Sequence, residues 1–549
     1  MPSDIADDAR RWLEQDPDPQ TQRELQALLE SNDDEQRSEL ADCFAGRLEF
    51  GTAGLRGKLG PGPNRMNRVV VMQAAAGLAA YINEHHPHEA SIVIGYDARH
   101  NSDVFAADTA AIMQGAGIDA LVLPKPLPTP VLAYAIKHLG ASAGVMVTAS
   151  HNPPQDNGYK VYLGDGCQIV PPADADIAKE IERIATITSV QDIPKGGEWV
   201  TLGDDVLEDY IARTISLVTD EQRSDNRSFT TVITPMHGVG GSTLHGVLTK
   251  AGFPEPIHVT EQFNPDPSFP TVTFPNPEEP GAMDLALHAA AQHQPDLVIA
   301  NDPDADRCAI AIPTDGGYRM LTGDEVGSLL GWWATQQDST RTTLAQSIVS
   351  GTMLKSIAES AGLAYEHTLT GFKWIGRIPN LRFGYEEALG YCVDPEAVSD
   401  KDGISAALLV ATMAAHLKAN NQTLQGKLDD LAKDHGVHAT KQVSVRVADI
   451  ARIAEVMATL RNQPPSAIGG LDVTRFIDLE EGPDLPPTDG LLFELAGNAR
   501  VIIRPSGTEP KVKAYLQTVV PVSTDLASAR EQADHQIAVL EADVRTWLG

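Results

Sequence analysis

Short β-branched segments alternate with alanine-rich helical segments along the chain, and this alternation limits the folds that the chain can adopt. β-Branched runs at 91–97, 120–123 and 143–150 flank the helical pattern FAADTAAIMQGAG at 105–117. Strands that alternate with helices of this length are typical of βαβ units, in which helices cover a largely parallel sheet. The alternation therefore predicts an α/β fold.

The same alternation restarts twice, which predicts two further α/β units. The first contains a strand, a glycine turn and a helix in TVITPMHGVGGSTLHGVL from residue 231, a Pro-rich loop at 264–280, a helix, and the strand DLVIA at 296–300. The second begins where Thr322 is expected to open a helix, and SIVSG from residue 347 is its first predicted strand.

The two ends of the chain depart from this alternation. Residues 1–48 predict a packed helical lead-in, where Thr21 is expected to cap a helix that carries leucines at helical spacing. From about residue 440, the segments KQVSVRVAD, LDVTRFIDL, GLLFELAG and ARVIIRPSG predict strands, with ARIAEVMATLRNQ and the C-terminal segment as helices. Runs of strands of this kind predict an α+β unit with antiparallel pairing.

The length of the chain requires several domains. Its 549 residues are about three to four times the usual length of a domain, and 42% apolar with 21% charged residues is typical of folded globular proteins. We predict three α/β domains, the first with the helical lead-in, and a C-terminal α+β domain. Their predicted bounds are 1–205, 206–320, 321–438 and 439–549.

The charge of the chain argues against two classes of partner. Its 75 acidic and 42 basic residues give a net charge of −33, which would repel nucleic acid and an anionic membrane surface. No C-x-x-C pair is formed by Cys43, Cys167, Cys308 or Cys392, so neither a disulfide framework nor a thiolate zinc site is predicted. The N-terminal segment MPSDIADDARRWLEQ is acidic where a secretory signal is basic. We therefore expect a cytoplasmic protein with neither nucleic acid nor membrane as a partner.

The segment TASHNPPQDNGYK, residues 148–160, places the hydroxyl of Ser150 at the end of a predicted strand. Two prolines fix the turn that follows, and open α/β sheets bind ligands at the carboxyl ends of their strands. A turn without function is the alternative, because serine and asparagine are common before proline. A hydrolase nucleophile is excluded, because Thr148 and Asn152 replace the two glycines of a nucleophile elbow.

The segment NDPDADR follows directly after an apolar strand. In an extended or loosely turned backbone, Asp302, Asp304 and Asp306 share a face, so their carboxylates can converge on one point. Converging carboxylates need a cation, and all-oxygen ligation suits Mg²⁺. An EF-hand is excluded, because Arg307 and Pro313 replace its glycine and its last glutamate. The alternative is a solvated acidic loop.

The segment RPSGTEP, which begins at Arg504, combines a guanidinium with a glycine between two hydroxyl residues. Backbone N–H groups around Gly507 and the hydroxyls of Ser506 and Thr508 can surround a phosphate, while the arginine binds two of its oxygens. The segment predicts a phosphate-binding loop, and a tight surface turn is the alternative.

Two glycine-rich segments match no nucleotide-binding motif. In GTAGLRGK, residues 51–58, Thr52 replaces the first glycine of a P-loop, and a leucine replaces its final serine or threonine. In GVGG, residues 238–241, the third glycine of a dinucleotide fingerprint is replaced by Thr243. Neither a P-loop nucleoside triphosphatase nor hydride chemistry is predicted, and Arg56 remains as a cation that could face negative charge.

Two further loops carry groups that suit a phosphosugar. TGFK, residues 370–373, contains Lys373, which could face a phosphate, and GYEEALGY, residues 384–391, contains Glu386 and Glu387. Carboxylates of this kind can accept hydrogen bonds from vicinal sugar hydroxyls. A solvated loop is the alternative for each.

Taken together and in this order, TASHNP, NDPDADR and RPSGTEP resemble the motifs of the α-D-phosphohexomutase superfamily, and the resemblance extends from Gly51 to Lys513. It implies a heart-shaped enzyme of four domains, three of them related α/β domains, that requires one Mg²⁺ per active site. It further implies an isomerase, an intramolecular phosphotransferase of the phosphoglucomutase/phosphomannomutase type, with a phosphoserine at Ser150. GYEEALGY and TASHNPPQDNGYKVY resemble most closely the phosphoglucomutase-2-like and phosphopentomutase subgroup.

The resemblance also implies roles for the residues of the site. The Ser150 phosphate would complete the coordination of Mg²⁺ by the three aspartates. It would then pass to the sugar and give a sugar 1,6-bisphosphate, which turns around in the site and returns its other phosphate to the serine. The same bisphosphate would serve as an activator. Lys160, Arg56 and His151 are the acid and base candidates, with Lys160 favoured because burial can lower the pKa of an amine, and Arg307 is expected to contact the phosphoserine. The residues expected to bind the sugar phosphate are Thr370, Gly371, Lys373, Glu386, Glu387, Arg504, Ser506, Gly507 and Thr508.

The sugar itself is not fixed by these motifs. Ala388 stands where hexose-specific relatives have a serine hydroxyl. Interconversion of glucose 1-phosphate and glucose 6-phosphate is the first interpretation and mannose phosphates the second, while ribose or deoxyribose phosphates, or synthesis of a sugar bisphosphate, are the alternatives. A phosphatase would not need the second phosphate site, and a non-enzymatic regulator would be expected to lack Ser150 or an aspartate. We expect a monomer or a homodimer.

Overall fold

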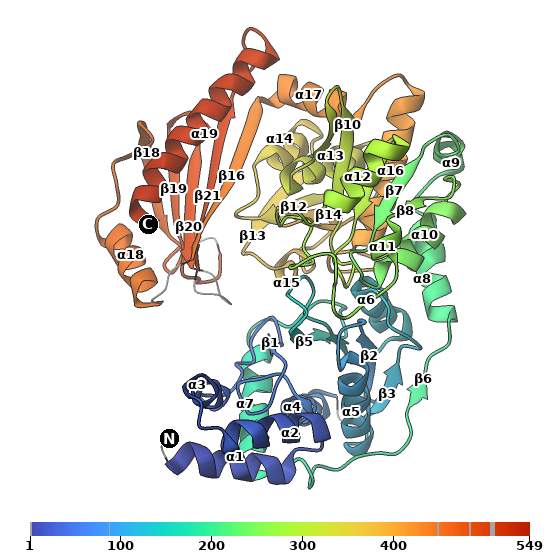
Figure 1. Cartoon of the computed structure of the whole chain (residues 1–549). Coiled ribbons are helices and arrows are strands. Elements are labelled where there is room, and N and C mark those ends of the chain that lie inside the picture. The colour runs from blue at the N-terminus through green and yellow to red at the C-terminus, as the bar shows by residue number, and fades with distance from the viewer. Residues whose placement is uncertain (1–2, 87, 447–449, 483–484, 506–510, 549) are drawn as a thin grey trace. The chain divides into compact units, whose positions relative to one another are not determined.

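The computed structural model divides the chain into two compact units. Figure 1 shows the helices and strands along the chain. Unit 1 consists of Met1–Leu321 and Gly390–His416, and unit 2 consists of Thr322–Leu389 and Leu417–Gly549. Within the described part of the chain, no helix combines the length and the apolar character that crossing a membrane needs. The structure describes residues 3–86, 88–446, 450–482, 485–505 and 511–548.

Unit 1 begins with the helices α1 (Ser3–Gln15), α2 (Pro19–Glu30) and α3 (Asp34–Cys43). The predicted cap of α2 was wrong, because Asp18 rather than Thr21 accepts a backbone N–H of the first turn, at 2.8 Å, and a proline follows at the first helical position. The Thr21 hydroxyl donates instead to the buried carboxylate of Asp16 at 2.7 Å. Leu25 is fully buried in the core of unit 1, which confirms that the lead-in packs against the first domain.

A six-stranded sheet in the order β1-β5-β4-β2-β3-β6 forms the first α/β domain. Its central strand β2 runs parallel to β3 and β4, whereas β5 is antiparallel to both β4 and β1. The predicted strands and the predicted helix of this domain are confirmed. The strands are β1 (Leu55–Lys58), β2 (Ser91–Tyr96), β3 (Asp119–Val122), β4 (Ala143–Val147), β5 (Asp156–Leu163) and β6 (Val200–Thr201), and the helices α4 (Arg68–His85), α5 (Ser102–Gly115), α6 (Thr129–Leu139) and α7 (Ala173–Ile187). The helices α8 (Asp205–Ile215) and α9 (Asp220–Asn226) follow β6 and precede the second sheet.

The second sheet of unit 1 has the order β11-β10-β9-β7-β8, with β7 parallel to β8 and β9. The predicted strands at 231 and 296–300 are confirmed, and NDPDADR follows β9 directly. The segment 390–416 contributes β15 (Gly390–Cys392) and most of α16 (Gly403–Ala419). The other elements are β7 (Thr231–Thr234), β8 (Ile257–His258), β9 (Leu297–Ala300), β10 (Ala309–Thr314), β11 (Gly317–Met320), α10 (Gly240–Lys250), α11 (Thr260–Phe263) and α12 (Asp284–His293).

In the first part of unit 2, β12 pairs in parallel with β13 and β14. Thr322 caps α13 in a capping box with Glu325, as predicted. The strand predicted from residue 347 was wrong: β12 ends at Ser347, and a turn follows in which Gly351 donates its N–H to Asp324 at 2.6 Å. The elements are β12 (Thr343–Ser347), β13 (Ala364–Thr368), β14 (Leu381–Glu386), α13 (Gly323–Gln336), α14 (Met353–Ser360), α15 (Phe372–Ile375) and α17 (Leu424–His435).

The second part of unit 2 is the predicted α+β domain, with an antiparallel sheet in the order β16-β21-β20-β19-β18-β17. The strand β21, absent from the predictions, lies between β16 and β20, and α19 packs along β16 and β21. The elements are β16 (Val437–Arg446), β17 (Ala467–Ile468), β18 (Leu471–Asp478), β19 (Leu491–Leu495), β20 (Arg500–Pro505), β21 (Lys511–Val520), α18 (Ile450–Asn462), η1 (Ala496–Asn498) and α19 (Leu526–Leu548).

Candidate active site

The serine loop follows β4, and Ser150 lies in it as a buried residue with left-handed backbone, φ 51°. The Ser150 Oγ donates a hydrogen bond to Asp302 Oδ2 at 2.8 Å, and it lies 3.3 Å from His151 Nδ1. On the neighbouring strand β5, Lys160 is paired with Met146 of β4, which brings its amine to the same end of the sheet. The hydroxyl of the predicted phosphoserine is therefore directed at the predicted metal loop.

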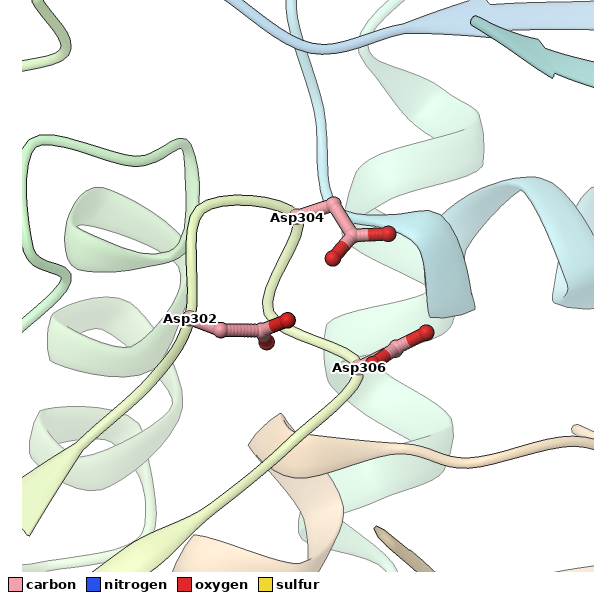
Figure 2. Close-up of side chains that lie close together, drawn as sticks. All are labelled: Asp302, Asp304 and Asp306. Carbon is pink, nitrogen blue, oxygen red and sulfur yellow. The ribbon is translucent and has the colours of Figure 1, made fainter. Parts of the chain in front are cut away.

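The three aspartates of NDPDADR come from one loop, and their side chains converge, as Figure 2 shows. One carboxylate oxygen from each of Asp302, Asp304 and Asp306 lies within 4.8 Å of the others, and all three residues are almost completely buried. Among the described residues, no donor reaches the buried Oδ1 atoms of Asp304 and Asp306. Buried anionic oxygens without donors are costly unless a cation binds them. The donor set fits a divalent cation with oxygen ligands.

Small residues allow the metal loop to lie against the start of α10. A Cβ on Gly238 would lie 2.3 Å from the Pro303 Cα, and Val239 donates its N–H to Pro303 O at 2.8 Å. From the start of α6, Thr129 donates its hydroxyl to Asp304 Oδ2 at 2.6 Å and its N–H to Asp304 O at 2.9 Å. Gly238 thus allows close backbone packing against the metal loop, which gives this glycine a structural role.

Three cationic side chains surround the carboxylates. Lys160 Nζ lies 2.7 Å from Asp304 Oδ2 and 2.9 Å from Asp306 Oδ2. Lys401 Nζ lies 3.3 Å from Asp306 Oδ2, and Arg307 Nε lies 3.8 Å from Asp306 Oδ1 and 4.0 Å from Asp302 Oδ2. Lys401 is absent from the predicted site, because its place beside the triad depends on the packing of the segment 390–416 and no local motif signals it.

The charges in this cluster shift several pKa values in different directions. Burial and the neighbouring carboxylates raise the pKa of Asp302 well above its usual value. At Asp306, the effect of burial is outweighed by Lys160, Lys401 and Arg307, which lower the pKa of the carboxyl. Burial alone would lower the pKa of Lys160, but Asp304 and Asp306 raise it. Burial thus acts in the predicted direction, but the expectation that the pKa of this amine is lowered overall was wrong.

Two other predicted residues lie near Ser150: Arg56 contacts the serine loop, and His151 belongs to it. Arg56 of β1 donates from Nη1 to Asn152 Oδ1 at 3.2 Å. Burial, with the charges of Arg307 and Arg56, lowers the pKa of His151 well below its usual value, so its ring is neutral near pH 7. Arg56, His151 and Lys160 are thus all within the cluster around Ser150.

The predicted sugar and phosphate residues lie in unit 2, and the structure brings several of them together. Arg504 donates from Nη1 to the hydroxyl of Thr370, and Gly371 donates its N–H to Glu386 Oε1 at 2.6 Å. The amine of Lys373 lies 5.9 Å from the ring centroid of Trp374. The predicted residues Ser506, Gly507 and Thr508 lie outside the described residues.

Glu387 differs from Glu386 in its partners. Its Oε2 accepts hydrogen bonds from the hydroxyls of Ser347 at 3.0 Å and Ser350 at 3.1 Å. Burial, with the charge of Glu386 second, raises the pKa of Glu387 to about 7. This carboxyl is bonded to the protein's own hydroxyls, so its position supports a role in holding the turn after β12.

Models of one family match the chain along most of its length. They are described as phosphoglucomutase/phosphomannomutase alpha/beta/alpha domain I at residues 47–188, domain II at 208–316, domain III at 322–435, and the C-terminal domain at 442–523. The chain belongs to the phosphoglucomutase/phosphomannomutase family and has its four domains. It is a phosphosugar mutase, an isomerase that acts as an intramolecular phosphotransferase.

Individual relatives agree with this assignment. A Haemophilus influenzae protein named "Probable phosphomannomutase" is 51% identical, with 82% of this chain and 92% of that protein covered. The phosphoribomutase of Saccharomyces cerevisiae is 36% identical, with 94% of this chain and 93% of that protein covered. The crystal structure of parafusin, a phosphoglucomutase from Paramecium, shares the fold with a TM-score of 0.71 at 19% identity, over 92% of this chain and 96% of that chain.

Proposed function

We propose that this mutase interconverts hexose 1-phosphates and hexose 6-phosphates through a phosphoserine at Ser150. The observation that carries the proposal is the 2.8 Å hydrogen bond from the Ser150 hydroxyl to Asp302, within a triad whose other members have buried oxygens without donors among the described residues. A free serine is a weak nucleophile, whereas a phosphoserine brings close to two negative charges and can donate its phosphoryl group.

The three aspartates and the Ser150 phosphate would together hold one Mg²⁺. When bound, the ion neutralises charge on the phosphoryl group that is transferred. The donor set supports this assignment, because it consists only of oxygens, and the Thr129 hydroxyl and the turn at Pro303 fix the loop in place.

The cations around the triad would stabilise the transferred group. Phosphoryl transfer passes through a loose transition state whose charge lies on the equatorial oxygens, so positioned cations lower the barrier. Lys160, Lys401 and Arg307 lie close to carboxylates of the triad, which supports this role. We assign the proton transfers at the sugar hydroxyl to the set Lys160, Arg56 and His151.

The residues of unit 2 would bind the part of the substrate that does not react. Arg504 would bind the distal phosphate, with Ser506, Gly507 and Thr508 of the predicted loop, and Thr370, Gly371, Lys373 and Glu386 would bind the sugar hydroxyls and phosphate. Transfer from Ser150 gives a sugar 1,6-bisphosphate, which returns its other phosphate after turning around. The same bisphosphate, added from outside, would activate an enzyme that has lost its phosphate. We place this activity in the cytoplasm, in a monomer or a homodimer.

A hexose substrate, glucose or mannose phosphate, is supported by the 51% identical relative that is named a phosphomannomutase. A pentose phosphate is the second candidate. Two observations favour it: Ala388 provides no side-chain hydroxyl in the sugar loop, and a relative matched over nearly its full length is named a phosphoribomutase.

The proposal is tested by Ser150→Ala, with the exposed Ser339→Ala as the matched control. Ser150→Ala is expected to lower kcat by about 10³-fold or more, while calorimetric binding of glucose 1-phosphate is retained. Incubation with glucose 1,6-bisphosphate should add one phosphate to the wild-type chain, located at residue 150 by peptide mass spectrometry. Wild-type turnover in Ser150→Ala would refute the phosphoserine. Values of kcat/KM for glucose, mannose and ribose 1-phosphates then rank the substrates.

A further inference from the structure

The backbone of Ser150 is held from both sides by side chains that take no part in the chemistry proposed above. A left-handed backbone is unfavourable for a residue with a side chain, so surrounding bonds must maintain it. The N–H of Ser150 donates to Thr148 Oγ1 at 2.9 Å, and its carbonyl accepts from Arg99 Nη2 at 2.6 Å. The direction of the Ser150 hydroxyl therefore depends on Thr148 and Arg99.

Arg99 binds the main chain of the whole serine loop. Its guanidinium donates to the carbonyls of Ser150 and Asn152 at 2.6 Å each, of Pro153 at 2.8 Å and of Asp156 at 3.1 Å. The side chain is only 1% exposed, so these charged hydrogen bonds form away from water, where they are strong.

Asp97 joins the two supports of Ser150. Its Oδ2 accepts the hydroxyl of Thr148 at 2.7 Å and lies 3.3 Å from Arg99 Nε, and its Oδ1 accepts the hydroxyl of Ser102 at 2.7 Å. A short buried network thus connects the end of β2 to both peptide groups of Ser150.

An aromatic ring from the second domain covers the guanidinium. The Arg99 Cζ lies 4.9 Å from the ring centroid of Phe269, which is 3% exposed and belongs to the Pro-rich loop 264–280. The face of an aromatic ring attracts a cation, and more strongly where both are desolvated. Phe269 therefore stabilises the position of the guanidinium that binds the serine loop.

The Pro-rich loop is itself fixed to the turn beside the metal loop. His237 Nε2 and Gln262 Nε2 lie 2.8 Å and 2.9 Å from the Thr271 hydroxyl, and Asp266 donates its N–H to His237 O at 2.9 Å. His237 directly precedes Gly238, the glycine packed on Pro303. One loop thus connects the support of the aspartates with the support of Ser150.

We propose that Phe269 is a positioning residue for the phosphoryl transfer: acting through Arg99, it fixes the main chain that directs the Ser150 Oγ toward Asp302. The inference rests on the proposed phosphoserine mechanism. It assigns a function to the Pro-rich loop, whose sequence by itself predicts only a connection between two elements.

The test measures the transfer step itself. Enzyme labelled with ³²P at Ser150 by labelled glucose 1,6-bisphosphate is mixed with glucose 1-phosphate, and loss of label is followed by quenched flow. The single-turnover rate constant does not depend on the fraction of molecules that is folded. We expect Phe269→Leu to lower it about tenfold and Phe269→Tyr, which keeps the ring, to stay within about twofold of wild type. Phe274→Leu, the same change at a ring of this loop that is 46% exposed, should leave it unchanged.

If Phe269→Leu yields no folded phosphoenzyme, 3,4,5-trifluorophenylalanine at position 269 keeps the shape of the ring and removes its negative face. A slower transfer in that protein supports the proposal, and a wild-type rate constant in either protein overturns it while the proposed function stands. Absence of phosphate from Ser150 in the wild-type enzyme overturns the proposed function and this inference with it. The two failures are therefore distinguishable.

Discussion

Gly238 offers a direct test of whether the metal loop is positioned by packing against α10. The substitution Gly238→Ala adds one methyl group. In the structure this methyl carbon would lie 2.3 Å from the Cα, 2.4 Å from the O and 2.7 Å from the carbonyl carbon of Pro303. All three atoms are backbone, so no side-chain rotation can relieve the overlap.

The size of the effect follows from these distances. Ordinary contact begins at 3.4 Å, so the backbone at Pro303 or at residue 238 must move by roughly 1 Å. Pro303 lies between Asp302 and Asp304, and its displacement moves both carboxylates relative to Ser150. A misplacement of about 1 Å in a catalytic site can cost about 10²-fold in rate. We expect kcat of Gly238→Ala to fall by about that factor. The Mg²⁺ concentration that gives half-maximal activity should rise, because two of the predicted ligands are displaced.

The assay is the rate of conversion of glucose 1-phosphate to glucose 6-phosphate over a Mg²⁺ titration, with glucose 1,6-bisphosphate present. Gly246→Ala is the matched control, because it adds a methyl group within α10, the helix that begins two residues after Gly238. There the nearest atom outside the local backbone is Ile211 Cδ1 at 4.0 Å. It should keep wild-type turnover and gain up to about 1 kcal/mol of stability, since alanine is the better helix former. Folded Gly238→Ala with a wild-type kcat and Mg²⁺ dependence would refute the reasoning.

Burial raises the pKa of Glu387 from 4.5 to about 7, so between these pH values the native chain keeps a proton that the unfolded chain has lost. The free energy of unfolding therefore falls as the pH rises through this window, by about 3 kcal/mol. Glu387→Gln should therefore show a smaller drop in melting temperature than wild type between pH 5 and pH 8, and parallel curves would contradict this. Arg504→Ala should raise the KM for glucose 1-phosphate about tenfold or more, because a charged hydrogen bond to phosphate is lost, with kcat little changed. A fall in kcat at constant KM would instead place Arg504 in the transfer step.

Local patterns were sufficient where the interactions that form an element are themselves local. The capping box of Thr322 and Glu325 lies within one helical turn, and the strands of the first domain are continuous apolar runs. The strand β21 was not predicted although it contains β-branched and aromatic residues. It lies inside its sheet and is buried on both faces over much of its length, so it lacks the alternation that marks a half-exposed strand.

The same distinction holds for the site. The spacing of Asp302, Asp304 and Asp306 predicts that they converge, because the three lie on one loop. The contacts of Lys401 with Asp306 and of Phe269 with Arg99 join segments that are distant in the sequence. Such contacts are set by tertiary packing, so no spacing rule could indicate them.

The segment 390–416 has a practical consequence for dissecting this enzyme into fragments. A fragment that ends at Leu321 would lack Asp400 and Asp402, which accept hydrogen bonds from the buried hydroxyls of Tyr162 at 2.9 Å and Tyr210 at 2.8 Å. Each hydroxyl left without an acceptor costs about 1–3 kcal/mol. A stand-alone protein for studying phosphorylation of the serine loop must therefore carry these 27 residues as a graft, although they are encoded far downstream.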